Sequence, residues 1–129
     1  VALQCAARYA GERIVFDRPI GQNQSIQHPL AQRWIELEAA SLLTYRAAAL
    51  YDAGKPCGAE ANAAKYFAGE AGFKASETAV LTHGGMGYAK EFHVERYFRE
   101  AMIPRIAPVS REMILNYVST HSLGLPKSY

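Results

Sequence analysis

Two long stretches of the chain carry apolar and small residues at intervals of three and four, and this spacing is the strongest constraint on the fold. In the first stretch the repeating residues are Leu30, Trp34, Leu37, Ser41, Tyr45 and Ala48. An interval near 3.6 residues places side chains on one face of an α-helix. Gly54 and Pro56 follow directly, and glycine with a later proline ends a helix. The spacing therefore predicts a helix over 30–51, beginning after Pro29.

The second stretch predicts a helix over 59–82 that presents a ridge of small side chains. The ridge consists of Ala61, Ala64, Ala68, Ala71, Ala75 and Ala79. Small residues let a neighbouring helix approach closely, and Gly84 supplies the stop. Further helices are predicted over 1–15, 94–101 and 110–121, with a turn over 17–21 after the first.

The rest of the chain offers no pattern for a sheet. No segment alternates β-branched and polar residues over the length that a strand needs. Four or five amphipathic helices without a sheet bury their apolar faces most economically against one another. The sequence therefore predicts an all-α fold, an up-and-down four-helix bundle, in a single domain over residues 1–129.

Charge and cysteine usage argue against several classes of function. The chain carries 14 Lys and Arg residues against 12 Asp and Glu residues, and the two signs are interspersed. That balance argues against a nucleic-acid or membrane partner, and no apolar run reaches the roughly 20 residues of a membrane span. Cys5 and Cys57 lie far apart without CxxC spacing. A reducing, cytosolic setting fits this usage best.

A metal centre within the bundle is not predicted. Di-iron bundles need Glu-x-x-His on two helices, and no glutamate of this chain has a histidine three residues later. The histidines are scattered at His28, His83, His93 and His121. The glycine run after residue 83 follows a helix rather than a strand, so a turn of the bundle explains it more simply than a phosphate loop.

Five segments, in order and near the family spacing, resemble the C-terminal domain of acyl-CoA dehydrogenases. They are Arg13-Ile14-Val15-Phe16; Pro19-Ile20 with Gln24; Ala64-Lys65 with Ala68 and Glu70; Gly84-Gly85-Met86-Gly87-Tyr88; and Val94-Glu95-Arg96 with Arg99 and Ala101. Each motif alone is weak, but five motifs in register are specific. The resemblance implies that residues 1–129 form the C-terminal helical domain, without the N-terminal helical and middle β domains of complete family members.

The resemblance also implies a set of FAD contacts. In the family, the arginine at the position of Arg13 holds the pyrophosphate of a flavin bound mainly by a neighbouring subunit, a role that suits a planar guanidinium group. The full set of implied cofactor-binding residues is Arg13, Phe16, Gln24, Leu81, Gly84, Gly85 and Ser110. Two positions depart from the family pattern. Asp17 replaces the usual glycine, and Leu81 replaces a common glutamine, so only backbone contacts are expected at Leu81.

The position of the catalytic base is left open. In the family, a carboxylate removes the α proton of an acyl-CoA thioester while the β hydrogen leaves as hydride to the flavin. Pro108 stands where many members have the glutamate. We favour a flavin-dependent acyl-CoA dehydrogenase whose base lies upstream of Val1. The alternatives are a non-catalytic partner or assembly module, and a flavin oxidase or monooxygenase relative that lacks the base. Glu112 is a conceivable substitute but is expected to face solvent or the edge of the cofactor.

The resemblance implies partners and a location as well. The partners are an acyl-CoA substrate, further copies of the chain in a dimer of dimers, and an electron-transferring flavoprotein or oxygen as electron acceptor. The location is the bacterial cytoplasm, which we prefer, or the mitochondrial matrix. Tyr88 and residues 94–96 are assigned to packing and ion pairing, and Arg99 to bracing the bundle. The 129 residues alone are expected to be inactive.

Overall fold

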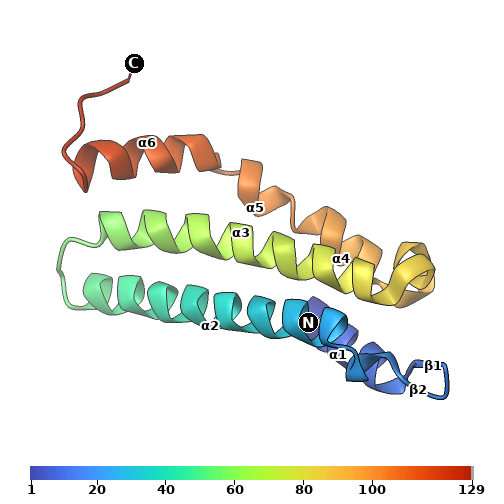
Figure 1. Cartoon of the computed structure of the whole chain (residues 1–129). Helices are drawn as coiled ribbons and strands as arrows, with labels where there is room; N and C mark the ends of the chain where they lie inside the picture. The colour runs from blue at the N-terminus through green and yellow to red at the C-terminus, as the bar shows by residue number, and fades with distance from the viewer. Residues whose placement is uncertain (129) are drawn as a thin grey trace.

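A computed structural model describes residues 1–128, and their regular structure is almost entirely helical (Figure 1). Two long antiparallel helices, α2 (Gln24–Asp52) and α3 (Gly58–His83), dominate the molecule. A short loop joins them, and its Gly54 has a φ of 64°, in the left-handed region that favours glycine. The helices predicted over 30–51 and 59–82 are therefore confirmed.

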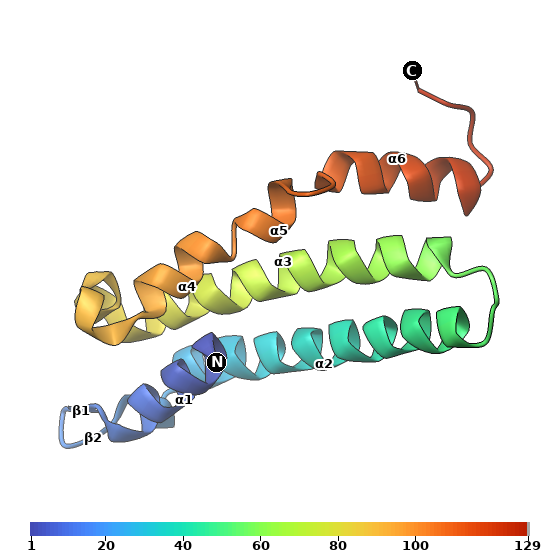
Figure 2. The ribbon, with the colours of Figure 1, turned by 180° about the vertical axis from the view of Figure 1, so that it is seen from behind.

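The other helices complete a bundle of four columns around α3. Helix α1 (Ala2–Glu12) packs against α3 and the start of α2. Helices α4 (Val94–Glu100), α5 (Ile103–Ile106) and α6 (Arg111–His121) follow one another along α3 as a single broken column (Figure 2). The predicted all-α bundle and the helices near 94–101 and 110–121 are confirmed. The short helix α5 was not predicted.

The first helix ends earlier than the sequence suggested. Helix α1 stops at Glu12, and β1 (Ile14–Val15) pairs antiparallel with β2 (Arg18–Pro19). The expectation of helix up to Val15, and of no strand, was wrong here. The two β-branched residues of β1 favour extended backbone. Phe16 and Asp17 both have positive φ, 51° and 62°, as a two-residue hairpin loop requires.

Helix α2 also begins before the predicted start, so that Pro29 lies inside it. A proline near the start of a helix removes a hydrogen bond without ending the helix. Asn23, the residue before α2, uses its side chain on the preceding turn instead of capping the helix. Its Oδ1 accepts a hydrogen bond of 2.8 Å from Nη2 of Arg18, and its Nδ2 donates one of 3.0 Å to the carbonyl of Ile20.

The core is thin and rich in alanine. Ala6 of α1 and Val94 of α4 are fully buried against Ala79 of α3. The buried alanines of α3 are Ala64, Ala71, Ala75 and Ala79. Ala61 and Ala68 are exposed instead, so only part of the predicted ridge packs within this chain.

Helix α3 also holds the segment between α4 and α6. The carboxylate of Glu70 pairs with Arg105, at 2.9 Å from Nε, and with Arg111, at 3.3 Å from Nη1. Lys65 donates hydrogen bonds to backbone carbonyls of the same segment. The exposed Pro108 therefore lies in a loop that is anchored on both sides.

The expectations for residues 88–99 are confirmed in part. Val94 is fully buried, and Glu95 pairs with Arg99 at 3.6 Å. Arg99 therefore forms an ion pair within its own exposed helix face rather than bracing the bundle. Tyr88, which was expected to pack, is 90% exposed.

Ser110 caps α6. Its Oγ accepts a hydrogen bond of 3.4 Å from the backbone N–H of Met113. We expect Ser110→Ala to lower the free energy of unfolding by about 1 kcal/mol, because one N–H of the first turn loses its acceptor. Denaturant unfolding measures the change. Ser122→Ala, just beyond the end of α6, is the matched control, and an equal loss in both variants would argue against the cap.

Candidate functional site

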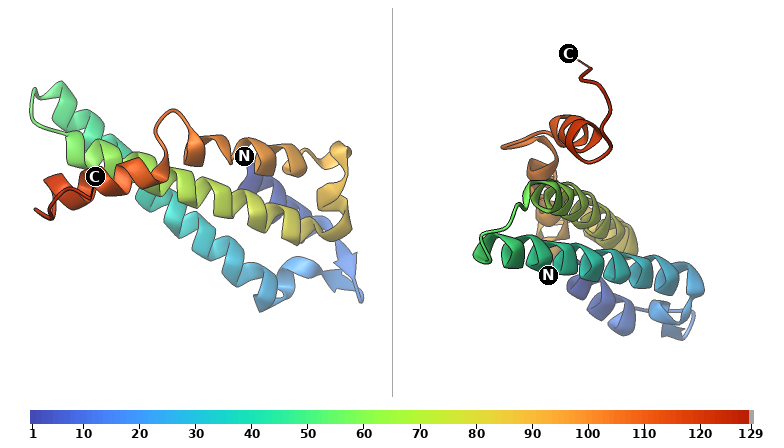
Figure 3. Two further views of the ribbon diagram at one scale, coloured as in Figure 1. Left: turned by 90° about the horizontal axis from the view of Figure 1, so that it is seen from above. Right: turned by 90° about the vertical axis from the view of Figure 1, so that its left-hand side faces the viewer.

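A surface hollow lies where the end of α1, the β1–β2 hairpin and the end of α3 meet, and we call it the hairpin hollow. Its volume is about 300 Å³. It is lined by Tyr9, Arg13, Val15, Ile20, Leu81, Thr82, His83, Gly84, Gly85 and Met86. The hairpin and the turn after α3 lie at the same end of the bundle (Figure 3). Segments far apart in the sequence therefore build one site.

Several of the predicted cofactor residues come together in the hairpin hollow. Those that line it are Arg13, Leu81, Gly84 and Gly85. Phe16 stands at the hairpin tip and is 94% exposed, and Gln24 is the exposed first residue of α2. Ser110 lies at the start of α6, away from this end of the bundle (Figure 1). These three residues are outside the lining of the hollow.

The turn η2 (Gly84–Tyr88) presents open backbone to the hollow. A Cβ added to Gly84 or Gly85 would meet no atom within 4 Å, and Gly84 also has a φ of 58°. Gly87 is different, because a Cβ there would collide with the backbone carbonyl of Val80. Packing within the chain explains Gly87 but not Gly85. The space beside Gly85 allows a ligand to approach the backbone.

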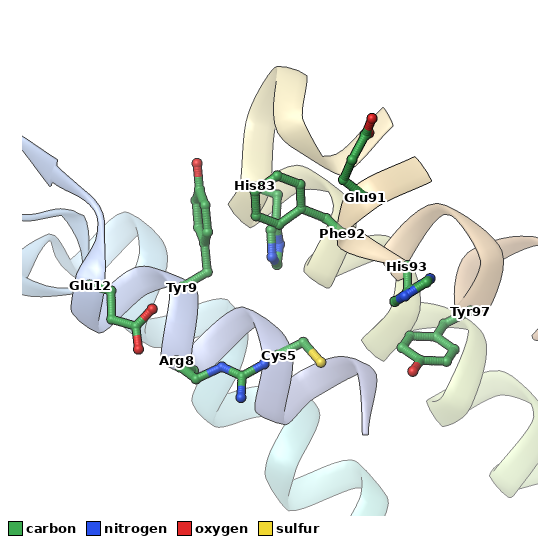
Figure 4. A pocket seen from close by; sticks show the side chains of 9 residues that line it. All are labelled: Cys5, Arg8, Tyr9, Glu12, His83, Glu91, Phe92, His93 and Tyr97. Atoms are coloured by element: carbon green, nitrogen blue, oxygen red, sulfur yellow. The ribbon is translucent and has the colours of Figure 1, made fainter. Parts of the chain in front are cut away.

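An aromatic cluster ties α1 to the end of α3 (Figure 4), and two of its members, Tyr9 and His83, also line the hairpin hollow. The ring of His83 stacks on Tyr9, with centroids 4.2 Å apart, and meets Phe92 edge-on at 5.5 Å. His83 Nδ1 donates a 2.7 Å hydrogen bond to the carbonyl of Ala79, which fixes the ring. Tyr9 lies one helical turn before Arg13. The stack therefore sets where Arg13 stands relative to the glycine turn.

Sequence reasoning missed both partners of this stack. It assigned no role to the side chain of His83, and it gave Tyr9 no role. The available signal was positional: His83 directly precedes the glycine turn, and Tyr9 precedes Arg13 by one turn.

A second and larger hollow, of about 620 Å³, lies on the other side of His83. Its lining residues are Cys5, Arg8, Tyr9, Glu12, His83, Glu91, Phe92, His93 and Tyr97, all labelled in Figure 4. The charges of this lining are mixed. In residues 1–128, no three His, Cys, Asp or Glu side chains gather in a way that could hold a metal ion. Cys5 and Cys57 are both free thiols.

The loop between α5 and α6 contains Pro108, whose side chain has no proton acceptor. The side chain of Glu112 is 71% exposed and pairs with Arg111 at 3.4 Å. It faces solvent, which is one of the two expected orientations. No helix in the described part of the chain combines the length and apolar character needed to cross a membrane.

Curated relatives agree on one family. The family described as "Acyl-CoA dehydrogenase, C-terminal domain" matches residues 1–123. Acyl-CoA dehydrogenase FadE12 of Mycobacterium tuberculosis is 50% identical over 130 residues, covering 99% of this chain and 34% of that protein. The mitochondrial short-chain specific acyl-CoA dehydrogenase of Bos taurus is 43% identical over 128 residues, covering 99% and 30%. The chain spans about a third of the length of these relatives.

Solved structures share the fold. A glutaryl-coenzyme A dehydrogenase in complex with glutaryl-CoA superposes with a TM-score of 0.92 at 37% identity, covering 98% of this chain and 32% of that one. An FAD complex of PigA also gives 0.92, at 26% identity, covering 96% and 32%. The sequence resemblance is therefore confirmed over nearly the whole chain, and the chain belongs to the acyl-CoA dehydrogenase family, in which it corresponds to the C-terminal domain.

Proposed function

We propose that the chain is the C-terminal helical domain of an FAD-dependent acyl-CoA dehydrogenase that desaturates an acyl-CoA thioester between its α and β carbons. One observation carries the proposal: the exposed Arg13 lines the same hollow as the open backbone of Gly84 and Gly85. Two neighbours in fold support it, because one contains FAD and another glutaryl-CoA. An N-terminal helical domain and a middle β domain would complete the enzyme.

The residues at the hairpin hollow fit the phosphate end of FAD. Arg13 offers a charged, planar set of donors for the pyrophosphate, and Gly85 leaves room for the cofactor against the backbone. Phe16, Gln24 and Leu81 would flank the bound molecule. FAD, when bound, supplies the acceptor for the hydride. Ser110 would make a separate contact, since its hydroxyl proton stays free to donate while Oγ caps α6.

The catalytic carboxylate, in this proposal, lies in the protein upstream of Val1. Pro108 cannot accept a proton, and Glu112 is paired and turned to solvent. The alternative functions named from the sequence also depend on the lack of a proton acceptor at position 108. A relative without any base would serve as a partner or assembly module, or carry out oxidase or monooxygenase chemistry on its flavin.

We also propose assembly into a dimer of dimers. Helix α2 leaves large apolar side chains exposed, namely Trp34, Ile35, Leu42 and Tyr45, each between 58% and 72%. Exposed apolar side chains of this size along one helix favour burial against another surface. Assembly would bring the hairpin hollow to a flavin held mainly by a neighbouring copy. An electron-transferring flavoprotein or oxygen would reoxidise the flavin, in the cytoplasm of a bacterium.

The test combines flavin content with substrate bleaching. The complete protein, with the upstream domains that this proposal requires, is expected to leave gel filtration yellow, with stoichiometric FAD, and to lose flavin absorbance when a saturated acyl-CoA is added. Arg13→Gln should raise the dissociation constant for FAD about thirtyfold, because a charge-assisted contact to phosphate is lost. Arg8→Gln is the matched control, because Arg8 lies on α1 more than one helical turn before Arg13.

Each alternative predicts a different result in this test. A colourless oligomer would contradict the enzyme and support the assembly module. Bound flavin that acyl-CoA does not bleach, in a protein that consumes oxygen with a reductant, would support the oxidase or monooxygenase relative.

A further inference from the structure

The β1–β2 hairpin turns one of its faces towards the hairpin hollow. Residues directly opposite in an antiparallel pair share a face, and faces alternate along each strand. Val15 pairs with Arg18, and the N–H of Ile20 donates a 2.9 Å hydrogen bond to the carbonyl of Arg13. One face thus carries Arg13, Val15, Arg18 and Ile20. All except Arg18 line the hollow, which places Arg18 on the same face at the rim.

Arg18 is held in place by a neutral side chain, which leaves its positive charge uncompensated. Its Nη2 donates a 2.8 Å hydrogen bond to Oδ1 of Asn23, and Asn23 is fixed in turn by the carbonyl of Ile20. An amide orients a guanidinium group but carries no charge, and the other N–H donors of the group stay available. Neither Arg13 nor Arg18 forms an ion pair with a carboxylate of residues 1–128.

We propose that Arg18 is a second phosphate-binding residue of the hairpin hollow, acting beside Arg13 on the pyrophosphate of the flavin. Two guanidinium groups without a carboxylate partner on one face favour a ligand with more than one negative charge. Asp17 adds a carboxylate at the hairpin tip, and the positive charge of Arg18 offsets the negative charge of that carboxylate. The inference rests on the proposed FAD-binding function. It deepens that function by naming a contact that sequence reasoning missed.

The alternative role for Arg18 is structural, as a brace between the hairpin and Asn23. Arg18→Gln removes the charge and keeps an N–H donor for Asn23, whereas Asn23→Ala removes the brace and keeps the charge. The dissociation constant for FAD is measured for both variants of the complete protein, including its upstream domains, over a range of salt concentrations. The KM for the acyl-CoA is measured alongside, because its phosphates are a second source of the same chemistry.

We expect Arg18→Gln to raise the dissociation constant for FAD about tenfold. Its binding should also depend less on salt, because one screened charge pair is gone. Asn23→Ala should keep the salt dependence of the unchanged protein, and Arg18→Lys should recover part of the affinity. The KM for acyl-CoA should not change in any of these variants.

Other results would overturn the inference in distinguishable ways. If Arg18→Gln binds FAD normally while Arg13→Gln does not, Arg18 has no such role and the proposed function stands. If it binds FAD normally but its KM for acyl-CoA rises, the phosphate belongs to the thioester rather than to the flavin. Equal weakening by Arg18→Gln and Asn23→Ala, with unchanged salt dependence, would identify Arg18 as a brace. Failure of the unsubstituted protein to bind FAD would overturn both proposals.

Discussion

Gly87→Ala is expected to lower the free energy of unfolding by about 3 kcal/mol, because the packing leaves no space for the added methyl group. A Cβ at position 87 would overlap the backbone carbonyl of Val80 in the last turns of α3. No side-chain rotation relieves a clash with backbone, so the turn itself would have to move away from the helix. Chemical denaturation monitored by circular dichroism measures the loss.

Gly85→Ala is the matched control and separates packing from cofactor contact. A Cβ there would meet no atom within 4 Å, so the free energy of unfolding should change by less than about 0.5 kcal/mol. FAD affinity should nevertheless fall, since the new methyl group occupies part of the hollow. A loss of stability equal to that of Gly87→Ala would contradict this assignment of the two glycines.

Glu70→Ala is expected to lower the free energy of unfolding by about 2 to 3 kcal/mol, because it leaves Arg105 without a counter-charge and takes from Arg111 one of its two carboxylate partners. Glu70 and Arg105 are largely buried, with side chains 17% and 19% exposed, while Arg111 is 35% exposed and so loses less. The segment that carries Pro108 should detach from α3. Thermal unfolding would report a midpoint lower by about 10 °C.

Two further variants calibrate this effect. Glu70→Gln keeps an oxygen acceptor for Arg105 and should lose less than half as much stability. Glu77→Ala removes an exposed carboxylate from the same helix and should change the free energy of unfolding by less than about 0.5 kcal/mol. The role of Glu70 would be refuted by an unchanged midpoint in Glu70→Ala.

The long helices could be predicted from the sequence, whereas the place where helix gives way to hairpin could not. Periodicity over 30–51 and 59–82 is sustained for many turns, so local preference and packing agree there. At Ile14 and Val15 the helical spacing of apolar residues continues, but these two residues pair with β2 and form a strand instead. Such pairing depends on positive φ at both Phe16 and Asp17. Aspartate tolerates this conformation, but phenylalanine rarely adopts it.

The candidate site was recognisable only in pieces. Motif resemblance assigned Arg13 and the glycine turn to one cofactor, but periodicity contains no information about the distance between them. That distance depends on how α1 docks on α3, through the stack of Tyr9 on His83. Ser110 illustrates the reverse case. That Ser110 caps a helix could be predicted from the local sequence. Its distance from the hairpin hollow, by contrast, depends on the path that α4, α5 and α6 take along α3.

The hairpin hollow joins the first helix to the end of the third, and this has a consequence for any ligand that fills it. A molecule that touches both Arg13 and the glycine turn acts as a non-covalent staple across a long loop of chain. A ligand that binds only the folded chain stabilises it by mass action, and the gain in free energy of unfolding grows with the logarithm of the ligand concentration. Because α1 reaches the thin core through the small side chains of Ala6 and Ala10, bound cofactor would strengthen its attachment to the bundle.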